Sequence, residues 1–265
     1  MDAIKNLILN LKNLNVQIDV DGEDLRIAAK KGVIDDQLKE LIKKHKQDLI
    51  NLVLRSRQLT LKNIPLLSLQ TDYELSSSQR RLWILDQLDE GNVAYNMSGV
   101  YVFEDDFDSH CLELSFQQLI SRHEILRTVF RENVKGEIRQ YILSPEAVGF
   151  SFSYHELYGS RETGLSVDKL IVNDLQRPFD LSSGPLLRAS VYHVGDHEWI
   201  FTYTMHHIIS DGWSMGILIR EALNYYSAYL TRKAPLVSPL RIQYKDYAAW
   251  QQAQLSGEFL QAHKS

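Results

Sequence analysis

The chain has 265 residues, of which 44% are hydrophobic and 24% are charged, a composition typical of a globular protein rather than a disordered or fibrous one. Its formal net charge of −5 argues against nucleic acid as the main ligand, because phosphate binding requires a basic surplus. The single cysteine excludes an internal disulfide and a cysteine-based zinc site. No apolar run could span a membrane and no signal peptide is recognisable, so we expect a cytoplasmic protein with no membrane partner.

Residues 1–56 predict a small separate unit built as helix, hairpin and helix. Asp21-Gly22 lies between two segments in which apolar and polar residues alternate, which is a strong hairpin signal. Asp35 and Asp36 suit the start of the second helix, where carboxylates can accept hydrogen bonds from the free backbone N–H groups and are favoured by the helix dipole. The predicted elements are a helix over 4–14, strands over 16–20 and 25–29, and a helix, whole or broken, from Asp35 to about Arg55.

Hydrophobic periodicity fades over residues 57–72, which we interpret as a linker. Residues 73–265 then predict a mixed α/β domain, because helical and strand-like patterns alternate along them. The expected helices cover about 76–88, 109–121, 166–176, 214–231 and the segment after Tyr244. The expected strands cover about 98–103, 127–133, 137–143, 149–154, 186–194 and 198–205.

The segment Met205–Ser214, with the sequence MHHIISDGWS, carries the clearest chemical signal. Consecutive histidines at a strand end point to opposite faces, so His206 and His207 are not expected to share a metal ion. Imidazole can accept a proton near neutral pH, which makes this a candidate acid–base site with Asp211 orienting it and Gly212 allowing a sharp turn. The alternative, equally open from these residues alone, is that the histidines end a strand and Asp211 caps the next helix.

A second motif overlaps the first. Gly212–Gly216 reads G-x-S-x-G, which occurs in hydrolase nucleophile elbows. That motif requires a strand directly before the first glycine, whereas several loop residues precede it here. We therefore expect Ser214 to be an ordinary residue in the first turn of a helix.

Four segments in the same order give the chain a resemblance to the condensation domains of nonribosomal peptide synthetases. Met205–Ser214 resembles the HHxxxDG motif of that family, and Arg122–Phe130 is similar to RHExLRTxF. Leu75–Leu85 resembles SxAQxRLWxL, with Ser78 in place of the usual alanine, and Tyr244–Trp250 resembles YxDYAxW. The resemblance implies one chloramphenicol-acetyltransferase-like lobe that joins a donor acyl or peptidyl group to an acceptor amine.

The same resemblance implies roles for individual residues. His207 would be the catalytic candidate, either as a base or as a group that positions the amine, while His206 and Gly212 would shape the turn. Asp211 would pair with Arg122 to hold the loop, and Arg127 would lie nearby. The simpler interpretation of both arginines is that they are surface cations near a helix end, where they suit the helix dipole.

Residues 1–56 separately resemble the N-terminal docking domains of the TubC type. Such domains receive the C-terminal peptide of an upstream subunit along a hairpin edge, because an unpaired strand edge offers free N–H and C=O groups. The lysines here would favour an acidic tail, or would simply solubilise the strand edge. The candidate contact residues are Val20, Leu25, Arg26, Ile27, Lys30 and Lys31.

The substrates implied are thioesters on the phosphopantetheine arms of donor and acceptor carrier proteins, with no cofactor bound directly by this chain. Because the family's second lobe has no counterpart before Ser265, we expect residues 1–265 alone to condense little or nothing. Two alternatives remain: a non-catalytic interaction module, or a stand-alone acyltransferase that uses coenzyme A.

Overall fold

The computed structural model describes residues 2–256 apart from positions 15, 22–23, 31, 63, 89–92, 105–106 and 160–166. The chain forms two compact units, Met1–Pro65 and Leu66–Ser265, and the division falls inside the predicted linker. Among the described helices, none combines the length and the apolar character that a bilayer crossing requires.

The first unit has the predicted order of helix, hairpin and helix. Its elements are α1 (Asp2–Asn13), β1 (Gln17–Asp21), β2 (Asp24–Ala28), α2 (Asp36–Lys44) and α3 (Lys46–Lys62). The two strands pair antiparallel with Asp21 opposite Asp24, which confirms the hairpin, although Gly22 lies outside the described residues. The core of this unit is formed by apolar side chains from both helical parts and from the chain just before β1. Its buried members are Leu7, Leu11, Val16, Leu38, Ile42 and Leu49.

The second helical stretch of this unit is broken, one of the two expected forms. Asp35 caps α2, because its carboxylate accepts the backbone N–H of Leu38 at 2.7 Å. The break lies at His45, between α2 and α3. The helix α3 continues to Lys62, beyond the predicted end near Arg55, because no proline interrupts the chain before Pro65.

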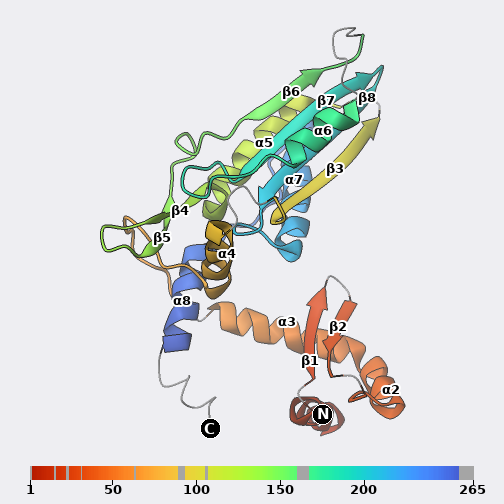
Figure 1. Ribbon diagram of the computed structural model, residues 1–265. Coiled ribbons are helices and arrows are strands. Elements are labelled where there is room, and N and C mark those ends of the chain that lie inside the picture. The colour runs from red at the N-terminus through yellow and green to blue at the C-terminus, as the bar shows by residue number, and fades with distance from the viewer. Residues whose placement is uncertain are drawn as a thin grey trace. The chain divides into compact units, whose positions relative to one another are not determined.

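The second unit is the expected mixed α/β domain. Figure 1 shows its main sheet, in the strand order β3-β8-β7-β6, with helices on both faces. Its first elements are α4 (Ser77–Leu88), β3 (Asn96–Glu104), α5 (Ser109–Arg122), the 3₁₀ turn η1 (Glu124–Arg127), β4 (Thr128–Glu132) and β5 (Ile138–Ile142). The others are β6 (Phe152–Glu156), α6 (Val167–Leu175), β7 (Leu187–Gly195), β8 (Glu198–His206), α7 (Gly212–Thr231) and α8 (Tyr244–Ser256).

The connections follow from the strand directions. Strands β7 and β8 form the predicted hairpin, and β3 pairs antiparallel with β8 at the edge of the sheet. Strand β6 pairs parallel with β7, so the chain must cross over between them, and α6 lies in that crossover. Strands β4 and β5 form a separate antiparallel pair, which the sequence did not distinguish from the main sheet.

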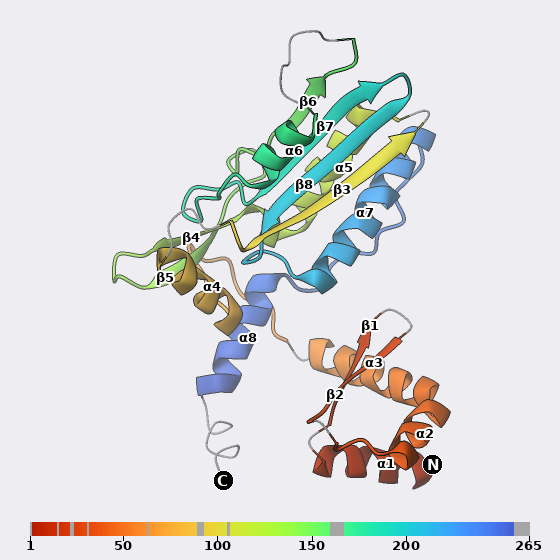
Figure 2. The same ribbon diagram turned by 45° about the vertical axis from the view of Figure 1, so that its right-hand side comes forward.

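The main sheet has two chemically different faces. Helices α5 and α7 cover one face and α6 covers the other, as Figure 2 shows. Along β8, Phe201, Tyr203 and Met205 are buried in the hydrophobic core, whereas the alternating positions are polar. The polar row on β8 consists of Thr202, Thr204 and His206, all buried. This alternation places a histidine at the end of the polar row.

Candidate functional site

The turn that follows β8 carries both candidate histidines. Strand β8 ends at His206, and residues 207–211 lead into α7. The side chains of Ile208 and Ile209 are buried in the core of the domain and anchor the turn there. The backbone N–H of His207 donates to the carbonyl oxygen of Tyr95 at 2.8 Å, which ties the turn to the start of β3. The turn is therefore fixed on two sides.

His207 is exposed, and a hydrogen bond holds its ring. Its Nδ1 lies 2.6 Å from the carbonyl oxygen of Ser210. A carbonyl oxygen can only accept, so Nδ1 must carry the proton in that bond. In the neutral ring Nε2 is then the unprotonated nitrogen with a free lone pair. The geometry provides a proton acceptor on a side chain that solvent or a substrate can reach.

His206 has the opposite environment, with 1% of its surface exposed. Its Nδ1 accepts the backbone N–H of Ile208 at 3.1 Å, so in the neutral ring Nε2 carries the hydrogen. Burial, followed by the nearby charge of His207, lowers the pKa of His206 to about 4. His206 is therefore neutral at physiological pH, and its bond to Ile208 shapes the turn.

Asp211 is the N-cap of α7. Its Oδ1 accepts the backbone N–H of Ser214 at 2.7 Å and the hydroxyl of the same residue at 2.6 Å. The expected pair between Asp211 and Arg122 is wrong, because Arg122 donates instead to Glu221, at 3.0 Å from its Nε. The capping alternative describes Asp211 correctly, since a carboxylate just before a helix satisfies its free N–H groups.

Arg122 belongs to a group of polar contacts that the sequence did not predict. His123 Nε2 lies 2.7 Å from Glu221, so two neighbouring side chains share one carboxylate. Gln243 bridges the same region, donating to the carbonyl of Arg122 at 2.9 Å and accepting the N–H of Glu124 at 3.1 Å. The RHE segment thus joins α5, α7 and the start of α8. Glu221 was detectable in principle, because it is the sole acidic residue in α7.

Arg127 also has structural contacts. It donates to the carbonyl oxygen of Leu143 and lies 3.8 Å from the carboxylate of Glu124. These contacts join η1 to the end of β5. The side chains of Arg127 and His207 have no hydrogen bond or ion pair with each other among the described residues.

Two other chemistries receive no support from the part of the chain that the structure describes. No cluster of three potential metal ligands occurs there. Ser214 lies in the first turn of α7 and donates its hydroxyl to Asp211 at 2.6 Å, as expected for a helix-start residue and not for a nucleophile. Gly212 starts the helix rather than following a strand directly.

A groove of about 590 Å³ opens beside the start of α7. Tyr101 and Tyr203 of the sheet line it, together with Gly212 and apolar side chains of α7. The helix residues are Met215, Ile219 and Leu223. The groove thus borders the turn that carries His207, although the ring of His207 does not line it.

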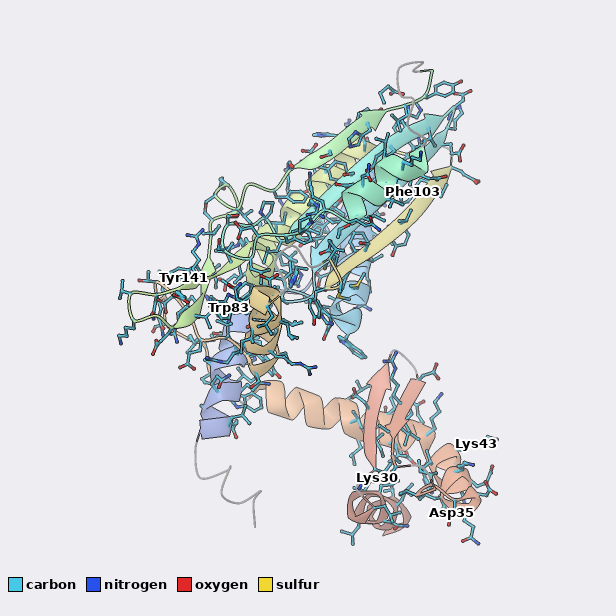
Figure 3. The ribbon with its side chains drawn as sticks, viewed as in Figure 1. Lys30, Asp35, Lys43, Trp83, Phe103 and Tyr141 are labelled. Carbon is cyan, nitrogen blue, oxygen red and sulfur yellow. The ribbon has the colours of Figure 1, made fainter. Side chains whose placement is uncertain are left out.

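The candidate docking residues lie on and after the β1–β2 hairpin. The side chain of Val20 is 1% exposed, so it supports the unit from inside and is not a surface contact. Leu25 is half-buried, whereas Arg26, Ile27 and Lys30 are exposed, and Lys31 lies outside the described residues. Figure 3 labels Lys30 after β2 and Lys43 on α2.

Comparison with known families decides the assignment. Residues 69–265 match the Condensation domain family, which covers about three quarters of the chain. The chain belongs to the condensation-domain family. Residues 4–53 match the TubC N-terminal docking domain, which confirms the second resemblance.

The relatives of this condensation domain include large synthetases. It is 39% identical over 195 residues to malpinin synthetase of Mortierella alpina, covering 74% of this chain and 2% of the relative. Over 192 residues it is 34% identical to chondramide synthase cmdD of Chondromyces crocatus, covering 71% of this chain and 5% of the relative. The chain therefore spans a few per cent of the length of these relatives.

Solved structures show the same fold. The starter condensation domain of rhizomide synthetase RzmA superposes with a TM-score of 0.64 at 24% identity, covering 72% of this chain and 46% of that one. The X-domain bound to OxyB from teicoplanin biosynthesis gives a TM-score of 0.64 at 25% identity, covering 74% and 41%. The condensation-domain segment thus spans less than half of either solved chain.

Proposed function

We propose that this condensation domain takes part in amide formation between two carrier-bound thioesters, with His207 as the group that meets the attacking amine. The observation that carries this proposal is the 2.6 Å contact between His207 Nδ1 and the carbonyl of Ser210. Because that bond holds the proton on Nδ1, the lone pair of Nε2 is free in the neutral ring. An exposed imidazole in that tautomer can accept a hydrogen bond or a proton from an amine.

The reaction follows from this arrangement. The acceptor amine nitrogen attacks the donor thioester carbonyl, so a C–N bond forms and the C–S bond breaks. The amine proton passes to Nε2 of His207 and then to the departing phosphopantetheine thiolate, which leaves as the thiol. If His207 only positions the amine, the same nitrogen accepts a hydrogen bond and the proton leaves through solvent. Both roles require the Nδ1–H tautomer.

Substitution of His207 tests the proposal and separates the two roles. The assay uses a complete condensation domain that includes these residues, with donor and acceptor carrier proteins loaded with thioesters. His207→Ala is expected to lower the condensation rate by about 100-fold or more while leaving the fold intact. His207→Gln places an amide near the position of Nε2 but cannot take a proton, so substantial activity in it would indicate positioning. The exposed His110→Ala serves as the matched control, and unchanged turnover in His207→Ala would refute the proposal.

We also propose that the N-terminal unit binds the C-terminal tail of an upstream synthetase subunit. In the described part of this unit, the sheet contains only β1 and β2, so its edges are open to an added strand. Strand β2 is the more exposed of the two and carries Arg26 and Ile27, with Lys30 shortly after it. An extended peptide with acidic residues would pair with such an edge through backbone hydrogen bonds and with the cations through charge.

Calorimetry with acidic C-terminal peptides tests the docking proposal. Binding to the chain is expected to weaken as salt is raised, because the charges involved are exposed and therefore screened. Lys30→Ala is expected to weaken binding and to reduce its salt dependence, whereas Lys135→Ala, an exposed lysine of the other unit, serves as the control. Affinity that is equal for acidic and neutral peptides would contradict the charge component, and no binding of any such peptide would contradict the proposal.

A further inference from the structure

The face of the main sheet under α6 is lined by polar side chains that reach toward the end of that helix. On β7 this row includes Arg188 and Ser190, and on β8 it ends with His206. Ser190 donates its hydroxyl to the carboxylate of Asp174 in α6 at 3.0 Å. The polar face is thus bound to α6 by hydrogen bonds rather than by apolar packing alone.

Arg188 satisfies the carbonyl groups at the end of α6. Its guanidinium donates to the carbonyl oxygens of Asp174 at 3.1 Å, Arg177 at 2.6 Å and Pro178 at 3.2 Å. The last carbonyls of a helix have no partner within the helix and carry a partial negative charge, so a cation is favourable there. Burial lowers the pKa of Arg188 to about 10, which leaves the group protonated at neutral pH. One buried cation therefore holds three carbonyl groups between Asp174 and Pro178.

Asn96, the first residue of β3, holds the same segment. Its Nδ2 donates to the carbonyl oxygens of Leu175 at 3.0 Å and Arg177 at 3.1 Å. Asn96 is the residue of β3 that lies opposite His206 in the sheet register. The end of α6 is therefore fastened to the sheet immediately beside the buried histidine.

The contacts that Arg188 and Asn96 make with the end of α6 are here called the clasp. Phe179 connects the clasp to the turn that carries the histidines. The guanidinium carbon of Arg188 lies 3.9 Å from the centroid of the Phe179 ring. The same ring meets His206 edge-on, with centroids 6.3 Å apart and an interplanar angle of 83°. Tyr95 lies at 6.2 Å from the His206 ring. The position of His206 is thus set by two aromatic neighbours, one of which rests on Arg188.

We propose that Arg188 is a positioning residue for His207, acting through Phe179 and His206. His206 accepts the N–H of Ile208, the residue directly after His207, so a displaced His206 ring would remove one of the bonds that hold the turn. The loosened turn would keep Ser210 less firmly in place as the acceptor for His207 Nδ1. This inference rests on the proposed role of His207, but its structural part can be tested without catalysis.

The structural test uses NMR of the ring nitrogens in a chain whose histidines are isotopically labelled. The spectra are recorded at a temperature at which each variant is folded. Arg188→Met removes the charge and the hydrogen bonds while keeping a long side chain. It is expected to move the His206 ring signals and to give His207 a mixture of tautomers instead of the single Nδ1–H form. Arg177→Met, which alters an exposed side chain of the same segment, should leave both histidines unchanged. Lower stability with unaltered signals from both histidines would overturn the proposal.

A second variant covers the case in which Arg188→Met does not fold. Phe179→Leu keeps the hydrogen bonds of Arg188 but removes the ring between it and His206. It is expected to give the same direction of change in the His206 and His207 signals. If Phe179→Leu leaves both sets of signals in place, the route through Phe179 is wrong.

Activity measurements then separate this inference from the proposed function. In a complete condensation domain, Arg188→Met is expected to lower kcat by about 10- to 100-fold with little change in KM, because a misplaced group affects the reacting geometry. Arg188→Lys should recover part of the rate, since it restores the charge but not the planar fork. Altered NMR signals with unchanged kcat would refute the role of His207 and leave the clasp intact. Unaltered signals would refute the clasp, whatever the result for His207→Ala.

Discussion

Arg122 and Glu221 form an ion pair of 3.0 Å that joins the last residue of α5 to the interior of α7. Both side chains are largely buried, with 15% and 16% of their surfaces exposed, and His123 shares the same carboxylate at 2.7 Å. The charge of Glu221 thus compensates a partly buried guanidinium. Removing it would leave Arg122 without its ionic partner.

We expect Glu221→Gln to lower the free energy of unfolding by about 2 kcal/mol, because an unpaired, partly buried cation is costly. Urea denaturation measures the change. Glu113→Gln is the matched control, since Glu113 is also helical but its ion-pair contact, at 3.8 Å to His110, is loose and exposed. Equal midpoints for the two variants would show that the pair contributes nothing.

Asp211 is expected to act on stability as a cap. Asp211→Ala should lower the free energy of unfolding by about 1 kcal/mol, whereas Asp211→Ser should retain most of it, because a serine hydroxyl can also accept the N–H of Ser214. Denaturation of the isolated chain measures this difference. In a complete condensation domain, Asp211→Ser is further expected to keep most of the condensation rate. A rate as low as that of His207→Ala would instead require the carboxylate itself in the reaction.

The buried His206 predicts a pH dependence of stability. Its pKa is about 4 in the folded chain against an ordinary value of 6.5, so the unfolded chain binds this proton first as the pH falls. The free energy of unfolding should therefore decrease on acidification from about 6.5 to about 4, by up to about 3 kcal/mol. The contribution of neutral His206 to the free energy of unfolding is present in full above about pH 6.5.

The variant His206→Asn isolates that contribution. Its amide oxygen can replace Nδ1 as the acceptor for Ile208, but it does not titrate. The difference between the two proteins, measured by urea denaturation over a pH series, removes the contributions of the carboxyl groups. A difference that stays constant across this pH interval would mean that the pKa of His206 is the same in the folded and the unfolded chain.

Two glycines are expected to respond to alanine with opposite signs. A Cβ added at Gly99 in β3 would lie 2.5 Å from Cε1 of Tyr203, so Gly99→Ala should destabilise the chain by about 1–3 kcal/mol. At Gly216 in α7 the added Cβ would have no described atom within 4 Å apart from its chain neighbours and the backbone of the helix itself, so Gly216→Ala should stabilise the chain by about 0.5–1 kcal/mol. Thermal unfolding of both variants checks the pair. Stabilisation by Gly99→Ala would mean that the Tyr203 ring moves away at no cost.

Much of the fold could be predicted from periodicity alone. The alternation of apolar and threonine residues before His206 predicted β8, and Asp21-Gly22 predicted the first hairpin, because both signals depend on near neighbours in the chain. The end of α3 at Lys62 was missed, since the periodic pattern weakens before the helix stops. The separate β4–β5 pair was missed because strand partners depend on distant residues.

The candidate site also has one part that the sequence predicted and one part that it did not. The opposite orientation of His206 and His207 was predictable from the strand period, and one histidine is indeed buried and the other exposed. The partner of Arg122 was not predictable, because Glu221 is 99 residues away and becomes adjacent only when α5 packs on α7. The contacts of Arg188 were not predictable either, since its partners are backbone carbonyls at the end of α6.

The two-faced character of β8 has a consequence for anyone who recombines synthetase genes. Since successive side chains alternate between the faces, deleting one residue upstream within this strand would bring His207 to the place of His206 and His206 to the place of Met205. The His207 ring would then be enclosed under α6, and the His206 ring would enter the hydrophobic core in which Met205 is buried. A hybrid gene joined inside this hairpin must therefore keep the number of residues in the strand unchanged, so that each side chain stays on its own face of the sheet.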